Sequence, residues 1–241
     1  MKVMTWNVLH RVHAENYREP AVTAWPDESA RVKAVAALVL KAVTADACEL
    51  VLLQEVSGDV LNELRHRLPP NLKICSHQVP RLPKLKVKTA TSLFDASEHL
   101  VVIGPPTLQT QRAMTAAGDE GKGLIAARVN EGLVAISTHV SWGSKGAAQL
   151  QVLQQVMAEL PGTVVLGGDF NAERDEVSRG LGDGYTVTEL AADSRRTRQS
   201  PDGEGADIDH LLCRGARWTD AHVVDHHGLS DHSPLIATLA A

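Results

Sequence analysis

Short apolar runs constrain the fold of this chain more than any other feature of its sequence. They occur at residues 50–53, 100–103, 124–127, 133–136, 164–166 and 235–236. Each run has strand character and ends near glycine, proline or a charged turn. A run without polar alternation predicts a strand that is buried on both faces. Several runs follow one another with no helix between them, so two sheets packed face to face fit better than a simple doubly wound sheet.

Three apolar stripes with helical spacing predict helices that pack on those sheets. The stripes are Val32, Val35, Val39 and Val43; Val60, Leu61, Leu64 and Leu68; and Leu150, Leu153, Met157 and Leu160. Pro69-Pro70 ends the second stripe and Pro161-Gly162 ends the third. The pattern contains no repeat and no linker, so we expect one α/β domain over residues 1–241.

Composition and charge exclude several classes of protein. Hydrophobic residues make up 44% of the chain, which is enough for a packed core. The formal net charge of -5 argues against a protein that grips long duplexes, but it allows a local basic patch. Cys48, Cys75 and Cys213 are scattered, as expected in a reducing compartment. No run approaches the ~18 apolar residues of a membrane helix and no signal peptide is evident, so we expect a soluble cytoplasmic protein with no obligate protein partner.

Polar side chains follow the apolar runs at the points where the strands should end. They are Asn7, Glu55, His139, Asp169, Asn171, Asp209, Asp231 and His232. Buried strands deliver their terminal residues to one rim of a sheet, so we expect these groups to converge. The carboxylates of Glu55, Asp169 and Asp231 would repel one another without a cation. Oxygen ligands of this kind suit Mg²⁺ or Mn²⁺ better than zinc.

Each of these residues also has a simple structural explanation when it is taken alone. Asp169 and Asn171 fit an ordinary Asx turn, Glu55 fits a solvated turn, and His139 fits a core histidine. All of these explanations would have to hold together, and they would leave several strand ends polar for no shared reason. A common site is therefore the preferred interpretation.

Taken in order, these motifs resemble the endonuclease/exonuclease/phosphatase superfamily, which has a deoxyribonuclease-I-like fold. The motifs are Trp6-Asn7, Gln54-Glu55, Thr138-His139, Gly168-Asp169-Phe170-Asn171, Asp209 and Ser230-Asp231-His232. Any one of them is weak, but six in order from residue 3 to residue 239 are poorly explained by chance. The resemblance implies a four-layer α/β/β/α sandwich, in which two packed, mostly antiparallel sheets are flanked by helices.

The resemblance also implies a divalent-metal-dependent phosphoesterase with a defined metal site. Glu55 would bind the catalytic Mg²⁺ or Mn²⁺, and Asn7 and Asp231 would lie close by. The reaction would be a metal-assisted displacement at phosphorus by water.

Roles in catalysis follow from the same resemblance. Asp169 would orient and deprotonate the attacking water, and Asn171 would hold a phosphoryl oxygen. Asp209 would pair with His232 and fix its tautomer while His232 contacts the phosphate. His139 would stabilise the developing charge or protonate the leaving oxygen.

Local stretches of sequence indicate the branch of the superfamily. Similarity to the branch of deadenylases, nocturnin and the Angel phosphatases, which act on RNA 3′ ends or nucleotide phosphates, is found in Trp6-Asn7-Val8-Leu9, Leu53-Gln54-Glu55-Val56 and Thr138-His139-Val140-Ser141-Trp142. Gly167-Gly168-Asp169-Phe170-Asn171 with the following Arg174 to Val177 is similar to tyrosyl-DNA phosphodiesterases. The leading hypothesis is an RNA 3′ end or nucleotide substrate. The alternatives are a DNA nuclease or DNA-end repair phosphodiesterase, and a catalytically inactive binding module, which is disfavoured because no acidic position is missing.

Candidate substrate contacts lie outside the motifs. Arg195, Arg196 and Arg198 belong to residues 178–206, which we expect to form one long surface loop overhanging the site, and Trp142 follows the His139 motif. A solvated loop with no substrate contact is the alternative for the arginines.

Two further features of the sequence leave alternatives open. A second basic segment alternates with apolar residues and predicts an edge strand with a charged outer face, although it could also guide substrate. Its basic residues are Arg81, Lys84, Lys86 and Lys88. Asp207 should share a strand face with Asp209, where it would either help to hold a second cation or repel phosphate.

Overall fold

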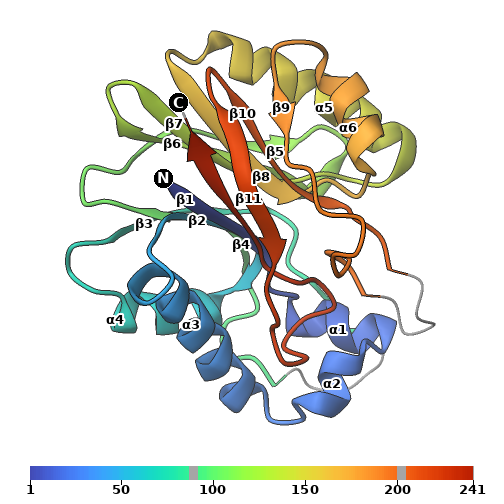
Figure 1. The fold of residues 1–241 in the computed structure, drawn as a ribbon. Helices are drawn as coiled ribbons and strands as arrows, with labels where there is room; N and C mark the ends of the chain where they lie inside the picture. Colours follow the sequence, from blue (N-terminus) through green and yellow to red (C-terminus); the bar gives the residue numbers. More distant parts are fainter. Residues whose placement is uncertain (87–91, 200–204, 241) are drawn as a thin grey trace.

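The computed structural model describes residues 1–86, 92–199 and 205–240 and contains two six-stranded sheets packed face to face (Figure 1). The first sheet has the order β11 (Arg217–Val223), β12 (Leu235–Ala240), β1 (Lys2–Asn7), β2 (Cys48–Ser57), β4 (Glu98–Gly104) and β3 (Lys73–Gln78). The second has the order β5 (Gln109–Ala116), β6 (Asp119–Asn130), β7 (Leu133–His139), β8 (Thr163–Asp169), β10 (Asp209–Arg214) and β9 (Thr186–Val187). β1 and β2 are parallel, as are β7 and β8, and the other neighbouring strands are antiparallel.

Helices cover the outer faces of both sheets, as Figure 1 shows. α3 (Glu28–Thr44) and α4 (Gly58–Arg67) lie against the first sheet, and α5 (Gly143–Glu159) and α6 (Arg174–Leu181) lie against the second. The short helices α1 (Arg11–Tyr17) and α2 (Pro20–Ala24) lie near one end of the strands. The predicted four-layer α/β/β/α sandwich is confirmed, as are the three helices predicted from the apolar stripes.

Burial of the strands on both faces explains their continuous apolar runs. Along β2, Leu50 and Leu52 face the second sheet, where they pack in one cluster with Val165. The alternate residues Val51 and Leu53 pack in the cluster that contains α3 and α4. Because each layer covers one face, both sets of side chains on a strand must be apolar.

The prediction of one loop over residues 178–206 was wrong in its first part. α6 continues to Leu181, and β9 pairs with β10. Val177 and Leu181 are fully buried against the α5 layer, which stabilises a helix too short to show a clear apolar stripe. Residues 200–204 of this stretch lie outside the described residues.

The prediction of an edge strand at Arg81 to Lys88 was also wrong for the described part of the segment. β3 ends at Gln78, and residues 79–86 form no strand. Pro80 and Pro83 lack the backbone N–H that a strand ladder needs, which accounts for the irregular path. Lys88 lies outside the described residues.

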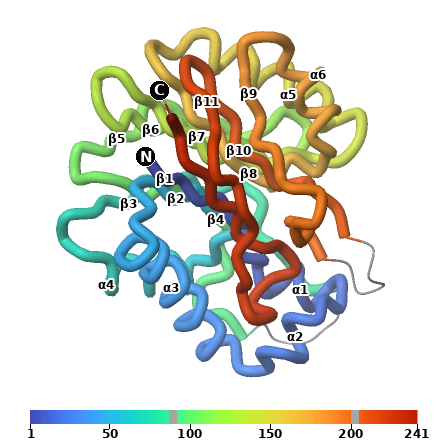
Figure 2. Tube along the Cα trace, in the orientation of Figure 1, coloured from blue at the N-terminus to red at the C-terminus, as the bar shows by residue number. Residues whose placement is uncertain are grey.

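The two ends of the chain meet in the first sheet, as Figure 2 shows. β1 pairs with β12 in antiparallel register, so the residues just before β12 lie beside the end of β1. Trp6 Nε1 donates a hydrogen bond to the His232 carbonyl at 2.9 Å, and Ser230 Oγ donates to the Asn7 carbonyl at 2.8 Å. These bonds position the last polar motif against the first. Among the described residues, no helix is both long and apolar enough to cross a bilayer.

Candidate active site

A polar pocket of about 470 Å³ lies among the strand ends, α1 and the segment before β12. Most of the site residues predicted from the sequence line this pocket. They are Glu55, His139, Trp142, Asp169, Asn171, Arg198, Asp231 and His232. The structure therefore brings together side chains that are up to about two hundred residues apart in the chain.

Asn7 and Asp209 are buried just behind the pocket wall. The Asn7 amide donates to Asp169 Oδ2 at 3.0 Å, and Asp209 Oδ2 lies 2.8 Å from His232 Nδ1. Each of these two residues therefore contacts one pocket-lining residue and restricts its orientation.

Close packing of three strands places Asp169 in the pocket. Asp169 stands opposite His139 in the parallel pair β7–β8 and opposite Asp209 in the antiparallel pair β8–β10. The approach of β7 to β8 requires Gly168, because a Cβ there would lie 2.0 Å from the Thr138 carbonyl oxygen. In the sequence Gly168-Asp169, a glycine required by packing therefore directly precedes a carboxylate of the pocket.

Glu55 reaches the pocket through a distortion of β2. The pairing of β2 with β4 shifts register between Leu53 and Val56, and Glu55 has a left-handed φ of 54°. Glu55 Oε2 accepts a hydrogen bond from the His10 backbone N–H at 3.0 Å. A non-glycine residue in this conformation is strained, and such strain clusters at functional sites.

The charge state of Glu55 is set by burial and by its cationic neighbours. Burial would raise the pKa of Glu55, but His13, His139 and Lys122 hold the pKa well below its ordinary value. Glu55 is therefore a carboxylate at neutral pH, as a cation ligand must be.

Asp169 lies at the centre of a hydrogen-bonded group. His139 Nε2 lies 3.1 Å from Asp169 Oδ2, and His232 Nε2 lies 3.8 Å from the same oxygen. Lys122 Nζ contacts His139 Nε2. Burial would raise the pKa of Asp169, but these neighbours hold the pKa well below its ordinary value. Asp169 is thus an ionised acceptor that can orient a water molecule.

His232 carries a positive charge over the neutral range. Burial lowers the pKa of His232, but the carboxylates of Asp209, Asp231 and Asp169 raise it from 6.5 to about 10. Its Nδ1 is engaged by Asp209, so Nε2 is the nitrogen free to donate toward the pocket. The arrangement can stabilise negative charge on a phosphoryl oxygen.

The structure separates the three arginines of the predicted substrate loop. Arg198 lines the pocket, with Nε 3.4 Å from Asp231 Oδ2. Arg195 is exposed and pairs with Asp225. Arg196 pairs with Asp207 and lines a neighbouring hollow.

The pairing of Arg196 with Asp207 bears on the two roles considered for Asp207, which were to help hold a second cation or to repel phosphate. Its carboxylate accepts a hydrogen bond from the Thr197 backbone N–H and pairs with Arg196. Asp207 lines the neighbouring hollow and is not among the residues that line the catalytic pocket. Arg196 therefore partly neutralises the negative charge of Asp207.

Several pocket residues were missed by the sequence analysis. They are Leu9, His13, Tyr17, Glu19, Asp119, Lys122 and Ser141. Lys122 stands between two glycines in β6, and no spacing in the sequence relates it to His139. Arg81, interpreted from the sequence as part of an edge strand, also lines the pocket and pairs with Asp119.

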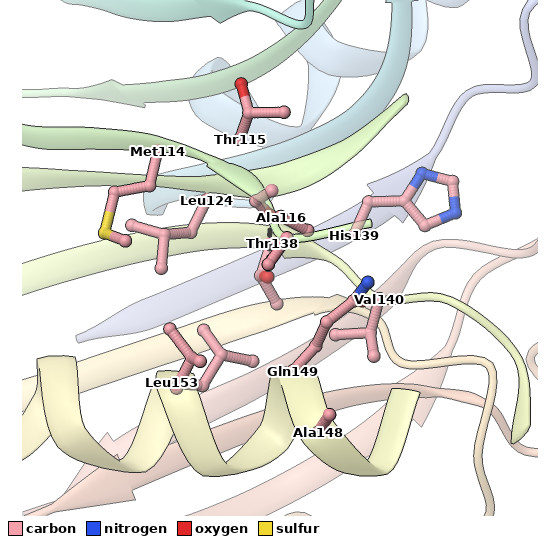
Figure 3. Close-up of a pocket in the computed structure, with 13 residues that line it drawn as sticks. Met114, Thr115, Ala116, Leu124, Thr138, His139, Val140, Ala148, Gln149 and Leu153 are labelled. Carbon is pink, nitrogen blue, oxygen red and sulfur yellow. Dashed lines mark hydrogen bonds between the residues drawn. The ribbon is translucent and has the colours of Figure 1, made fainter. Parts of the chain in front are cut away.

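An apolar hollow of about 270 Å³ lies between α5 and the β5–β6 hairpin (Figure 3). Figure 3 shows Leu124 and Leu153 approaching it from opposite sides, while the His139 ring points away from both. His139 thus borders two different hollows, and its imidazole belongs to the polar one.

The donor set of the polar pocket fits a divalent cation. Glu55, Asp231 and Glu19 contribute carboxylates to the lining of the pocket, and hard oxygen donors of this type suit Mg²⁺ or Mn²⁺. Glu19 Oε2 is buried and has no hydrogen-bond partner within the part of the chain that the structure describes. Asp169, Asp209 and His232 also offer ligand atoms within 4.8 Å of one another, and His232 Nδ1 lies 2.8 Å from Asp209 Oδ2.

Solved structures with the same fold were found by structural comparison. D. rerio TDP2 complexed with a single-strand DNA product has a TM-score of 0.72 and 15% sequence identity, over 100% of this chain and 99% of that chain. The human nocturnin catalytic domain with bound sulfate has a TM-score of 0.63 and 18% identity, over 100% and 94%. Bacteroides thetaiotaomicron mannosyl-6-phosphatase has a TM-score of 0.66 and 14% identity, over 100% of both chains.

Sequence comparison assigns the family. No curated protein gives a significant match to this sequence. The model of the Endonuclease/Exonuclease/phosphatase family matches residues 4–232, which include every motif that contributes to the polar pocket. The chain therefore belongs to the endonuclease/exonuclease/phosphatase family.

Proposed function

We propose that this chain hydrolyses a phosphoester at an RNA 3′ end or in a nucleotide. Members of its family are metal-dependent phosphoesterases, so the reaction class is that of a phosphoric ester hydrolase. The observation that carries the proposal is the pair Asp169 and His232, with Asp209 behind His232, which shares one pocket with Glu55 and the basic side chains of Arg81, Lys122 and Arg198.

The phosphoryl group is held by positive charge and by amide donors. Lys122, Arg198 and the charged His232 line the pocket and attract phosphate oxygens. Asn171 Nδ2 donates one hydrogen bond to the Val140 carbonyl at 2.8 Å, and its second N–H is available to a phosphoryl oxygen.

Water activation falls to Asp169. Its Oδ1 accepts from the Asn171 backbone N–H at 3.0 Å, and its Oδ2 accepts from the Asn7 amide. These bonds hold the carboxylate in one orientation, so that it can accept the proton of a water molecule placed in line with the leaving oxygen. A divalent cation bound through Glu55 would supply charge neutralisation at the phosphoryl oxygens. His139 and Lys122 are placed to stabilise charge on the leaving oxygen.

The shape of the pocket favours a nucleotide-sized ligand. A volume of about 470 Å³ lies within the range of small-molecule sites. Trp142 and Tyr17 line the pocket and are 58% and 65% exposed, so aromatic surface is available for a base to stack on, and Lys86 Nζ lies 4.4 Å from the Tyr17 ring centroid. The unpaired base at a single-stranded end has such a free face.

A DNA-end phosphodiesterase is the second candidate. It is favoured by the structural likeness to TDP2, one solved form of which holds a single-strand DNA product. The same stacking residues would serve a DNA end, and only contacts to the ribose 2′-hydroxyl would separate the two.

A substrate panel tests the proposal. It should contain single-stranded RNA, single-stranded and duplex DNA, a 5′-tyrosyl oligonucleotide, NADP and a sugar phosphate, each with Mg²⁺ and with Mn²⁺. We expect kcat/KM to be highest for RNA or a nucleotide. A higher value for a DNA end would select the second candidate, and a higher value for the sugar phosphate would contradict both.

Arg198→Gln should raise KM for a nucleic-acid end by about tenfold, because one charge-assisted contact contributes on the order of 1.5 kcal/mol. The value of kcat should change much less, since the contact is made equally in the ground state and the transition state. Arg195→Gln is the matched control, because Arg195 is exposed and pairs with Asp225 outside the pocket. Equal KM values for the two variants would remove Arg198 from substrate binding.

Asp209→Asn should move the alkaline limb of the pH–rate profile to lower pH. The protonated form of His232 is present below its pKa of about 10 and is lost as the pH rises through that value. Asparagine removes the hydrogen-bonded carboxylate, so the pKa of His232 should fall toward 6.5 and the limb should follow. Asp207→Asn is the control, since Asp207 pairs with Arg196 outside the pocket. A limb that stays in place in Asp209→Asn would show that His232 does not act in its charged form.

A further inference from the structure

Glu98 is a buried carboxylate that the proposed reaction does not use. It begins β4 and is 2% exposed. Its Oε2 lies 3.0 Å from Nε2 of His13, on α1. Burial of a carboxylate is costly unless a counter-charge or a cation accompanies it. Glu98 therefore needs a positively charged group held close to its carboxylate.

Glu55 completes a three-residue group with these two side chains. One ligand atom from each of His13, Glu55 and Glu98 lies within 4.8 Å of the other two. Glu55 and Glu98 bring two carboxylates into this space. His13 contacts Glu98 directly, whereas the other cationic neighbours of Glu55 are His139 and Lys122 of the polar pocket.

A cation can reach this group from the catalytic pocket. His13 and Glu55 line the pocket, and Glu98 lies directly behind His13. Glu55 lies between the His13–Glu98 pair and the residues of the polar pocket around His139, because its Oε1 also lies 3.9 Å from His139 Nε2. A carboxylate has two oxygens, and in two-metal sites the cations lie about 3.5–4 Å apart. The two oxygens of Glu55 can therefore bind two neighbouring cations, one in the polar pocket and one beside His13 and Glu98.

His10 provides a second observation at the same place. Its ring is fully buried, and its centroid lies 5.5 Å from that of His13. Nδ1 accepts a hydrogen bond from the Val12 backbone N–H at 3.3 Å, which leaves the ring proton on Nε2. That buried Nε2 has no hydrogen-bond partner among the described residues. A water molecule on a nearby cation would supply the missing acceptor.

We propose that His13, Glu98 and Glu55 bind a second divalent cation beside the one that Glu55 holds in the proposed reaction. The mixed imidazole and carboxylate donors favour a transition ion such as Mn²⁺ over Mg²⁺. The inference rests on the proposed function only in assigning Glu55 to the first cation.

Mn²⁺ binding without substrate tests the site. Stoichiometry is measured by calorimetry and by the loss of the free Mn²⁺ signal in electron paramagnetic resonance. Wild-type protein should bind two Mn²⁺ per chain, and the double variant His13→Ala/Glu98→Gln should bind one. The control is His66→Ala/Glu63→Gln, which makes the same substitutions on α4 away from the residues that line the pocket and should keep both ions. A single Mn²⁺ in wild type, or two in the His13/Glu98 variant, would overturn the proposal.

Loss of folding in the double variant would not leave the question open. Near-ultraviolet circular dichroism shows whether the variant is folded. If it is not, the electron paramagnetic resonance spectrum of the wild-type protein loaded with Mn²⁺ decides whether the second site exists. Two ions that share Glu55 should give a spin-coupled dinuclear signal, whereas isolated Mn²⁺ signals alone would contradict the site. Because binding is measured without turnover, two bound ions in a protein that hydrolyses no phosphoester would refute the proposed function and leave this inference standing.

Discussion

Asp169→Asn and His232→Ala should each lower kcat by on the order of 10²–10⁴-fold, the loss expected for a general base or a transition-state donor. Asparagine keeps the shape of Asp169 but cannot accept a proton. Alanine at position 232 removes the charged imidazole that Asp209 holds at 2.8 Å. Both effects concern charge that develops as the phosphoester bond breaks, so KM should change less than kcat.

The double variant should be little worse than the poorer single variant. Asp169 Oδ2 and His232 Nε2 lie 3.8 Å apart, and in the proposed reaction both act on the same reacting group, so we expect their contributions not to add. His227→Ala is the matched control, because His227 is an exposed histidine near the same segment. Thermal unfolding should show that each variant is folded. Near-normal turnover in either folded single variant would remove that residue from the mechanism.

Glu55→Gln should weaken the cation on which the reaction depends. Substitution of groups behind a metal ligand costs roughly 10–100-fold in metal affinity, and loss of charge at the ligand itself should cost at least as much. The concentration of Mg²⁺ that gives half-maximal activity should rise accordingly. Glutamine keeps the side-chain length and adds no backbone strain beyond the φ of 54° already present at Glu55. Excess Mg²⁺ should recover part of the activity, which a folding defect would not permit.

The layers of the fold could be predicted because burial on both faces leaves a direct record in the sequence. Leu50 to Leu53 must be apolar at every position, since alternate residues face different layers. Shorter elements are harder to recognise in the sequence, because they bury fewer apolar residues. α6 buries only Val177 and Leu181, and its boundary could not be recognised within a polar stretch. The alternation of basic and apolar residues from Arg81 to Lys88 predicted an edge strand, but β3 ends at Gln78 and two prolines, Pro80 and Pro83, follow it.

The site could be predicted where polar residues end buried strands, as at Glu55, Asp169 and His139. Residues that reach the pocket from other places carried no such signal. Lys122 comes from within β6, and His13 comes from α1. Both are brought to Glu55 only by the packing of the two sheets and the path of the chain after β1. The path of the chain also places Arg195 and Arg198 in different surroundings, although they are three positions apart. Arg195 pairs with Asp225, and Arg198 pairs with Asp231.

Metal-restored hydrolysis tests the central claim most directly. The protein is freed of metal with a chelator, the chelator is removed, and hydrolysis of a chromogenic phosphodiester and of an RNA 3′ end is followed as Mg²⁺ or Mn²⁺ is added. We predict no turnover without metal, saturable recovery in wild type, and recovery at a much higher concentration in Glu55→Gln. Full activity in the metal-free protein, or identical titrations of wild type and Glu55→Gln, would contradict the account.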